Sequence, residues 1–481
     1  MMKNVPFLVF FFALAHVSLT AQQLVSSEYR GERSLLQMQA DFGFLMQNGI
    51  EMYKLTYTTP DINGQLDTAS GLIVIPVPEE GTFAYPLLCY QHGTVSSKDD
   101  VPSELAGGWE LAAVWSGLQY VAVAPDYLGL GESRGFHPYV HAETEASAAI
   151  DMMRAARQFM EGYSAAQIND QVFVTGYSQG GHAAAALQRE LEQNLSGEFP
   201  VTASAPMSGP YSISGEMLKL LLSDEPYFYP SYLPYTALSY NEAYGLYADI
   251  EDYFKQPYAA AIEEFYNGER DLNSLNTFLI TELTANEGAS ITRFMMQDSL
   301  VAVLESNDAS HPIIQALQDN DVYDWTPQAP TRLIYCTADD QVVYTNSLVA
   351  DSVMNANGAA DVMAVDVGPT LDHGACVQPA VIEAAGFFQP LKSVTVNSEE
   401  VPWTAVNSVQ IAPNPASEQV QLNGLPAAAY ISLVSPDGRR LQEWRTDSPQ
   451  ATLSLNNHPA GLYYLRIDSG AHSQLQKLIL R

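Results

Sequence analysis

Apolar and polar residues alternate near the start of the chain in a way that predicts strands. Residues 50–60 alternate with period two, residues 69–77 form a second such run, and Asp61-Ile-Asn-Gly64 lies between them. An Asn-Gly pair between two alternating runs is a strong hairpin signal. Apolar runs at residues 86–91 and 120–124 then predict two buried strands.

Helical patterns separate the buried strands from one another. Residues 109–118 and 142–163 carry apolar positions at helical spacing, and a short apolar strand follows at 172–174. Later runs predict a strand at 331–336, a last strand at 361–366 and a closing helix at 380–388. Strands that alternate with helices at this spacing predict a mostly parallel sheet with helices on both faces.

Residues 211–328 interrupt the alternation of strands and helices. Tyrosine and phenylalanine are concentrated in the first half of this segment, and helical patterns follow at residues 249–266 and 290–306. We expect a helical insertion that caps the sheet. Core packing is the ordinary role of any single aromatic residue, but as a group these side chains suit an apolar, adaptable lining for a substrate.

The last part of the chain has a different pattern. Residues 393–404 are polar and are interpreted as a linker after a main domain at 22–392. Residues 405–481 contain short strands separated by tight turns, with apolar runs at 409–412, 420–422, 430–434, 453–455 and 461–467. Several short strands with turns between them predict a small β-sandwich, in which no residue has a catalytic pattern.

Composition and the first residues indicate where the protein acts. The formal net charge is −34 without a basic run, which argues against nucleic acid and anionic membrane surfaces as partners. Residues 1–21 combine Lys3, an apolar core and small residues, which is typical of a secretory signal peptide cleaved between Ala21 and Gln22. No other segment approaches the ~20 apolar residues needed to span a bilayer. We therefore expect an exported protein without a transmembrane segment.

The strongest chemical signal is Gly176-Tyr-Ser-Gln-Gly180, which lies between the apolar run at 172–174 and a helix-forming stretch that starts at His182. Strand, Gly-x-Ser-x-Gly and helix together are the context of a nucleophile elbow. The turn is so tight that only very small residues fit two positions before and after the serine. It exposes the hydroxyl of Ser178 at a helix N-terminus, where negative charge is favoured. A glycine-rich turn with an incidental serine is the ordinary alternative.

A serine nucleophile needs a histidine that takes its proton and a carboxylate that orients the histidine. With this elbow the chain order is Ser, acid, His. Among the nine histidines, His373 is the candidate base, in a loop after the last predicted strand. The acid belongs in the loop after the preceding strand, which leaves Asp339 or Asp340.

An oxyanion hole requires two backbone N–H donors. We expect one from Gln179, the residue after the nucleophile, and the second from Thr94, after the strand that ends at His92-Gly93. His92 itself is expected to support that loop. No cofactor is expected: Gly129, Gly131 and Gly135 miss the dinucleotide fingerprint by one residue, and no metal-binding motif is present.

Several segments together resemble the α/β-hydrolase superfamily, most closely its secreted lipase and esterase branch. They are Tyr120–Ala124, Pro125-Asp-Tyr-Leu-Gly-Leu-Gly131, His137-Pro-Tyr139, Gly176–Gly181, Thr337–Asp339 and His373-Gly374. The resemblance covers about residues 25–391 and is weakest across the insertion. It implies carboxylic ester hydrolysis through an acyl-enzyme, and its Gly-Thr-Ala-Asp run places the acid at Asp339. Cys336, which stands where glycine is common, loosens that match.

The C-terminal segment resembles the sorting domain of type IX secretion. The segments that carry this resemblance are Ala412-Pro-Asn-Pro415, Asp437-Gly438, Gly461–Ile467 and Gln476–Arg481. It implies that the secretion machinery is a partner, and that the protein crosses the periplasm to become secreted or surface-attached. A carbohydrate- or surface-binding sandwich is the alternative.

The chain contains three cysteines, too few for a disulfide scaffold. Cys336 and Cys376 each lie three residues from a proposed triad member, and export to an oxidising compartment permits a disulfide between them. Free buried thiols are the alternative. For the whole protein, a peptidase or amidase with the same triad and a catalytically inactive binding protein compete with the esterase hypothesis.

Overall fold

The computed structural model describes residues 24–78, 82–396, 409–425, 429–436, 440–469 and 472–481. The chain divides into two compact units, Met1–Asn397 and Ser398–Arg481. The predicted signal peptide, residues 1–21, lies outside the described residues. Within the described ranges, no helix combines the length and the apolar character that crossing a membrane would require.

The first unit is built on one sheet with the strand order β1-β2-β3-β5-β4-β6-β7-β8-β9. Its strands are β1 (Leu24–Arg33), β2 (Gly49–Pro60), β3 (Leu66–Val77), β4 (Phe83–Gln91), β5 (Val121–Pro125), β6 (Ala166–Tyr177), β7 (Val201–Met207), β8 (Thr331–Tyr335) and β9 (Val362–Asp366). The first three pairs in this order, β1 with β2, β2 with β3 and β3 with β5, are antiparallel. All the following pairs, from β5 with β4 to β8 with β9, are parallel. The predicted hairpin is β2 and β3.

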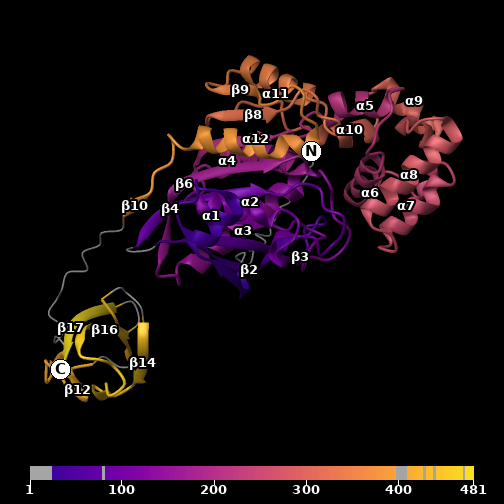
Figure 1. The fold of residues 1–481 in the computed structure, drawn as a ribbon. Helices are drawn as coiled ribbons and strands as arrows, with labels where there is room; N and C mark the ends of the chain where they lie inside the picture. Colours follow the sequence, from indigo (N-terminus) through magenta and orange to yellow (C-terminus); the bar gives the residue numbers. More distant parts are fainter. Residues whose placement is uncertain (1–23, 79–81, 397–408, 426–428, 437–439, 470–471) are drawn as a thin grey trace, which may run out of the picture. The chain divides into compact units, whose positions relative to one another are not determined.

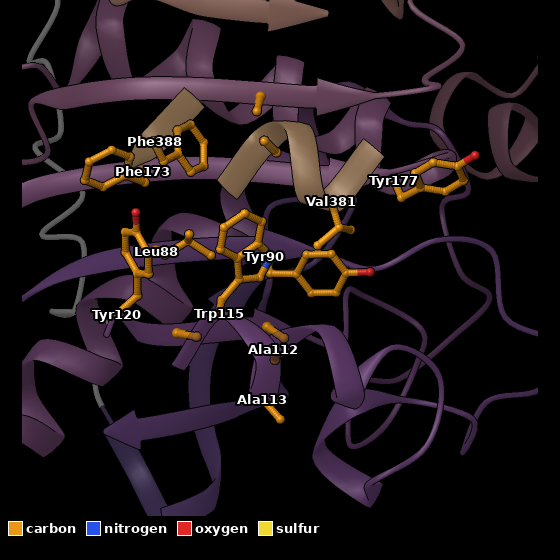
Figure 2. Packing of buried hydrophobic residues seen from close by; sticks show 14 of the residues in the cluster. Leu88, Tyr90, Ala112, Ala113, Trp115, Tyr120, Phe173, Tyr177, Val381 and Phe388 are labelled. Carbon is orange, nitrogen blue, oxygen red and sulfur yellow. The ribbon is translucent and has the colours of Figure 1, made fainter. Parts of the chain in front are cut away.

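Helices cover both faces of this sheet because alternate residues of each central strand point to opposite sides. Leu88 and Tyr90 of β4 pack with α2 (Trp109–Gly117) and α12 (His373–Phe388), as Figure 2 shows. Leu87 and Cys89, the alternate residues of the same strand, pack with α3 (Ala142–Met160) and α4 (Gln179–Asn194). Two apolar cores therefore hold the sheet between helical layers.

Three further elements complete these layers. Helix α1 (Leu35–Phe42) lies on the side of α2, and helix α11 (Thr345–Ala356) packs with α3 and α4. The 3₁₀ turn η1 (Pro102–Glu104) lies against β2, β3 and β5.

The insertion between β7 and β8 forms a cap, a group of helices beside the sheet (Figure 1). The cap has its own apolar core. Its elements are η2 (Ile213–Met217), α5 (Leu218–Leu222), α6 (Tyr232–Tyr244), η3 (Ile250–Asp252), α7 (Tyr258–Tyr266), α8 (Leu272–Glu287), η4 (Thr292–Met295), α9 (Asp298–Ser306) and α10 (Pro312–Asp319). The prediction of one continuous helix at 249–266 and of another at 290–306 was wrong. Each segment is a short 3₁₀ turn followed by a separate α-helix.

The polar stretch predicted as a linker at 393–404 begins inside the first unit. Strand β10 (Thr395–Val396) pairs with the start of β4, and the backbone N–H of Ser393 donates to Gln171 Oε1. The prediction was wrong for these first residues because polar side chains do not prevent an extended backbone from joining a sheet edge. Residues 397–404 of the predicted linker lie outside the described part of the chain.

The second unit consists of two antiparallel sheets around a core of alternating apolar residues. Strands β11 (Gln410–Ala412), β12 (Gln419–Asn423) and β15 (Gln450–Ser454) form one sheet. Strands β13 (Ala429–Val434), β14 (Arg440–Thr446), β16 (Gly461–Ser469) and β17 (His472–Leu480) form the other. The predicted β-sandwich is confirmed.

Candidate active site

The predicted elbow joins the end of β6 to the start of α4. Ser178 has φ 62° and ψ −124°, a backbone conformation that a residue with a side chain rarely adopts. Strain of this kind costs about 1–3 kcal/mol and persists where the surrounding structure imposes it. The N–H of Ser178 donates to the carbonyl of Met207 at 3.0 Å, which fixes the turn to the neighbouring strand β7.

The glycines of the elbow are required by close backbone approaches. A Cβ on Gly176 would lie 2.1 Å from the carbonyl oxygen of Gly180, and one on Gly180 would lie 2.0 Å from that of Gln91. A Cβ on Gly181 would lie 2.4 Å from the oxygen of Met207. No side chain fits at these distances, so the sequence motif follows from the packing of the turn.

The loop after β8 carries the two candidate acids, and they contact His373 through different atoms. Asp339 Oδ2 lies 2.7 Å from His373 Nδ1, and its Oδ1 accepts the N–H groups of Gln341 and Val342 at 3.0 and 2.9 Å. Asp340 Oδ1 accepts the backbone N–H of His373 at 3.1 Å. Asp339 therefore has the geometry that orients an imidazole, and Asp340 helps to hold the backbone of the histidine.

His373 was predicted in a loop, and this was wrong: it is the first residue of α12. Asp372 caps the helix by accepting the N–H of Ala375 at 2.8 Å. A helix start holds the imidazole more firmly than a loop would, because the backbone of the residue is fixed on its C-terminal side.

Tyr177 connects the elbow to the histidine. Its hydroxyl donates to the carbonyl of His373 at 2.6 Å, and the two ring centroids are 5.0 Å apart. Within the described part of the chain, Ser178 Oγ and the imidazole of His373 form no hydrogen bond. This does not exclude a catalytic pair, because catalytic hydrogen bonds are often long in the absence of substrate. The role of Tyr177 cannot be read from the sequence, because a buried tyrosine next to a glycine carries no sign of its partner.

The disulfide hypothesis is confirmed: Cys336 and Cys376 are bonded, with their Cα atoms 6.0 Å apart. The bond connects the residue after β8 to the first turn of α12. It therefore joins the segment that carries Asp339 to the segment that carries His373. Cys89 is a buried free thiol.

The two expected oxyanion donors lie on either side of Ser178. Gln179 is the first residue of α4, and Thr94 follows Gly93, at which a Cβ would lie 3.6 Å from that of Ser178. Neither backbone N–H donates to another group in the part of the chain that the structure describes. The hydroxyl of Thr94 is 2.8 Å from that of Tyr139, whose ring stacks on Tyr235 of the cap.

The side chain of Gln179 belongs to a buried polar network behind the elbow. Its amide nitrogen lies 2.9 Å from His137 Nε2 and 3.0 Å from Glu145 Oε1, and His182 Nδ1 lies 2.7 Å from Glu145 Oε2. Burial lowers the pKa of His137 to about 3, so its imidazole is neutral and accepts the amide proton. The backbone N–H of His182 donates to the carbonyl of Ser178 at 3.3 Å, while its ring contacts Glu145 and the carbonyl of Asn320, so the imidazole is directed away from the serine hydroxyl.

His92 contacts the backbone of the loop that carries Thr94. The Nδ1–H of His92 donates to the carbonyl of Gly93 at 2.8 Å. The hydroxyl of Tyr127 donates to the backbone carbonyl of His92 at 3.0 Å. Burial lowers the pKa of His92, so it stays neutral at ordinary pH.

A cavity adjoins Ser178 beneath the cap. Its volume is about 80 Å³, and Ser178, Gln179 and Tyr139 form one of its walls. The cap lines the cavity with Met217, Leu218, Leu221, Leu233, Leu304 and Leu317. This surface suits an apolar group attached to a carbonyl at Ser178. Among the described residues, no group of three or more His, Cys, Asp or Glu side chains is placed to hold a metal ion.

Solved structures of known proteins share the architecture of the first unit. The rice cell wall degrading esterase LipA from Xanthomonas oryzae is 28% identical, covers 76% of this chain and 97% of its own, and has a TM-score of 0.67. A putative hydrolase from Legionella pneumophila subsp. pneumophila str. Philadelphia 1 is 26% identical over 76% and 98% of the two chains, with a TM-score of 0.69. The first unit has the α/β-hydrolase fold of these proteins.

A more distant structure agrees with this fold. Candida antarctica lipase A is 13% identical over 73% of this chain and 77% of its own, with a TM-score of 0.52, which supports the α/β-hydrolase fold alone. No curated protein matches the chain. Residues 410–481 match the secretion system C-terminal sorting domain, so the second unit is a sorting domain that accompanies the α/β-hydrolase.

Proposed function

We propose that the protein is a secreted serine esterase that cleaves carboxylic esters through an acyl-enzyme. The observation that carries this proposal is the 2.7 Å contact of Asp339 Oδ2 with His373 Nδ1. His373 is in turn connected to the elbow, because the hydroxyl of Tyr177, the residue before the strained Ser178, donates to its carbonyl. In this assignment Ser178 is the nucleophile, His373 the base and Asp339 the orienting acid. The likeness of the α/β-hydrolase unit to an esterase supports the reaction class.

The proposed reaction has two halves. Ser178 Oγ attacks the ester carbonyl while His373 Nε2 takes its proton, and Asp339 stabilises the imidazolium through Nδ1–H. The backbone N–H groups of Gln179 and Thr94 stabilise the oxyanion. The tetrahedral intermediate breaks the bond to the alkoxy oxygen, which leaves as an alcohol with the proton from His373. Water, deprotonated by the same imidazole, then cleaves the acyl-enzyme to the acid and restores Ser178.

The proposed substrate has an apolar acyl group. The cavity beside Ser178 is lined mostly by aliphatic and aromatic side chains and, in the described part of the chain, by no charged residue, so it favours an alkyl chain over a charged side chain. A peptidase or amidase would use the same triad, and this alternative needs a separate assay because the triad alone does not distinguish the two reactions.

The test uses p-nitrophenyl esters of increasing acyl length beside an aminoacyl p-nitroanilide. We expect turnover of the esters, a preference for chains longer than acetate, and little or no turnover of the anilide. Ser178→Ala should abolish ester turnover with unchanged circular dichroism, since loss of the nucleophile costs several orders of magnitude in rate. Faster cleavage of the anilide than of every ester would reject the esterase assignment.

We also propose a route of export. The signal peptide at residues 1–21 would direct the chain into the periplasm, and residues 405–481 would then be recognised by the type IX secretion machinery. The match of residues 410–481 to a sorting domain supports this second step. Fractionation of host cells that express full-length and truncated protein tests it. Truncation should leave active enzyme in the periplasm, whereas equal activity in the medium from both forms would contradict the proposal.

A further inference from the structure

Gln341 connects the loop of the catalytic acid to the cap. Its backbone N–H donates to Asp339 Oδ1 at 3.0 Å. Its carbonyl oxygen accepts the hydroxyl of Tyr227 at 2.8 Å, and its side-chain Oε1 accepts the hydroxyl of Tyr232 at 2.8 Å. Gln341 therefore binds the proposed acid on one side and two cap tyrosines on the other.

The contact of Tyr227 reaches the acid through a single peptide group. The hydroxyl of Tyr227 donates to the carbonyl of Gln341. This carbonyl and the N–H of Val342 are the two ends of one planar peptide group. That N–H donates to Asp339 Oδ1 at 2.9 Å, and Asp339 Oδ2 contacts His373 Nδ1 at 2.7 Å. A hydroxyl on the cap thus holds the peptide plane that aims the carboxylate at the imidazole.

The two tyrosines are fixed to the cap rather than to the sheet. Tyr227 precedes α6, and its backbone N–H donates to the carbonyl of Ser290 at 2.7 Å, while Ser290 Oγ donates back to the carbonyl of Tyr227 at 2.7 Å. Tyr232 is the first residue of α6. Burial raises the pKa of both phenols, so both remain hydrogen-bond donors at any pH used in an assay.

The same side chains also meet the substrate cavity. Tyr227 and Tyr232 line it from the cap, and Val342 lines it from the acid loop. An acyl group in the cavity therefore contacts both ends of the connection between cap and acid. Binding energy from the acyl group can stabilise the arrangement that the chemical step requires, which raises kcat rather than only lowering KM.

We propose that Tyr227 and Tyr232 are positioning residues for catalysis, which hold the acid loop through Gln341 so that Asp339 is aligned when the cap is in place. This inference rests on the proposed esterase function. It assigns the cap a role in the rate of the chemical step in addition to lining the substrate cavity.

The test compares Tyr227→Phe and Tyr232→Phe with Tyr240→Phe on p-nitrophenyl acetate. Tyr240 is a matched control, because it is a buried cap tyrosine whose hydroxyl donates to a core carbonyl, that of Val140, at 3.1 Å without touching the acid loop. We expect Tyr227→Phe and Tyr232→Phe each to lower kcat about tenfold or more with KM changed less than twofold, since small misplacements of catalytic groups have effects of this size. Tyr240→Phe should keep kcat within twofold.

A double-mutant cycle between Tyr232→Phe and Gln341→Ala adds a second measurement. Both changes remove the same hydrogen bond, so their effects on kcat should not add. Thermal unfolding of every variant separates loss of the fold from loss of alignment. If the wild-type enzyme is active and Tyr227→Phe and Tyr232→Phe keep its kcat, the positioning role is refuted while the esterase function stands. The same follows if Tyr240→Phe loses as much kcat as the other two variants. Wild-type protein that cleaves no ester would instead reject the proposed function.

Discussion

Replacement of Asp339 by Asn gives the sharpest prediction about the acid. Asp339 Oδ1 accepts two backbone N–H groups, from Gln341 and Val342, so the carbonyl oxygen of an Asn would take that position. Its NH₂ group would then face His373 Nδ1 at the present 2.7 Å contact. Two donors cannot face each other, so the imidazole would adopt the other tautomer, in which Nε2 carries the proton and cannot accept one from Ser178.

The expected loss follows from this change of tautomer. We expect kcat on a soluble p-nitrophenyl ester to fall by about four orders of magnitude, which is about 5.4 kcal/mol of activation free energy. Asp340→Asn is the matched control, because its amide oxygen can still accept the N–H of His373, and kcat should stay within about tenfold. A greater loss in Asp340→Asn than in Asp339→Asn would refute the assignment of the acid.

Three further predictions concern the elbow, the disulfide and a buried carboxyl. Gly180→Ala should lower kcat/KM at least a hundredfold in steady-state assays with the helical circular dichroism retained, because its Cβ would lie 2.0 Å from a carbonyl oxygen of β4. Cys336→Ala/Cys376→Ala should lower the free energy of unfolding in urea by about 4 kcal/mol, since the bond closes a sequence separation of 40 residues. Burial raises the pKa of Asp151 from 3.8 to about 6. The folded state therefore becomes less stable as the pH rises from about 4 to about 6, because the unfolded chain loses this proton first. Asp151→Asn should therefore gain about 2 kcal/mol relative to wild type between pH 4 and pH 7 in unfolding titrations, because the carboxyl of the unfolded chain is already partly ionised at pH 4.

Local signals in the sequence were enough to predict the elbow and the first hairpin. Gly176 and Gly180 are required by backbone approaches within one turn, and such approaches leave a fixed spacing in the sequence. The Asn-Gly turn between β2 and β3 is similar, because a tight turn restricts its own residues. Features set by neighbours in the chain are the ones that a single sequence reveals.

Other elements were missed because their signals are weak. Strand β1 is mostly exposed at the edge of the sheet, so it lacks the alternation of a half-buried strand. Helix α1 is short, although the capping box of Ser34 and Gln37 could have revealed its start. The first turns of α12 contain Gly374 and Pro379, which lower helix propensity and hid the position of His373 at its start.

Contacts between distant segments could not be predicted. Tyr227 and Gln341 are separated by 114 residues, and a hydrogen bond from a phenol to a carbonyl leaves no pattern in either segment. The residues alone left Asp339 and Asp340 open, because adjacent aspartates differ only in where the folded loop directs them, and only the resemblance to a Gly-Thr-Ala-Asp run placed the acid at Asp339. Two separate residue-based arguments did find the candidate nucleophile and base, since chain order limits the choice of histidine.

Covalent labelling shows whether Ser178 is the nucleophile of an esterase. The purified protein is treated with a fluorophosphonate, and the adduct is located by intact mass and peptide mapping while ester turnover is followed. We expect one adduct, on Ser178, with loss of turnover in step with labelling, and neither labelling nor turnover in Ser178→Ala. An adduct on another residue, or ester turnover that persists in Ser178→Ala, would contradict this assignment.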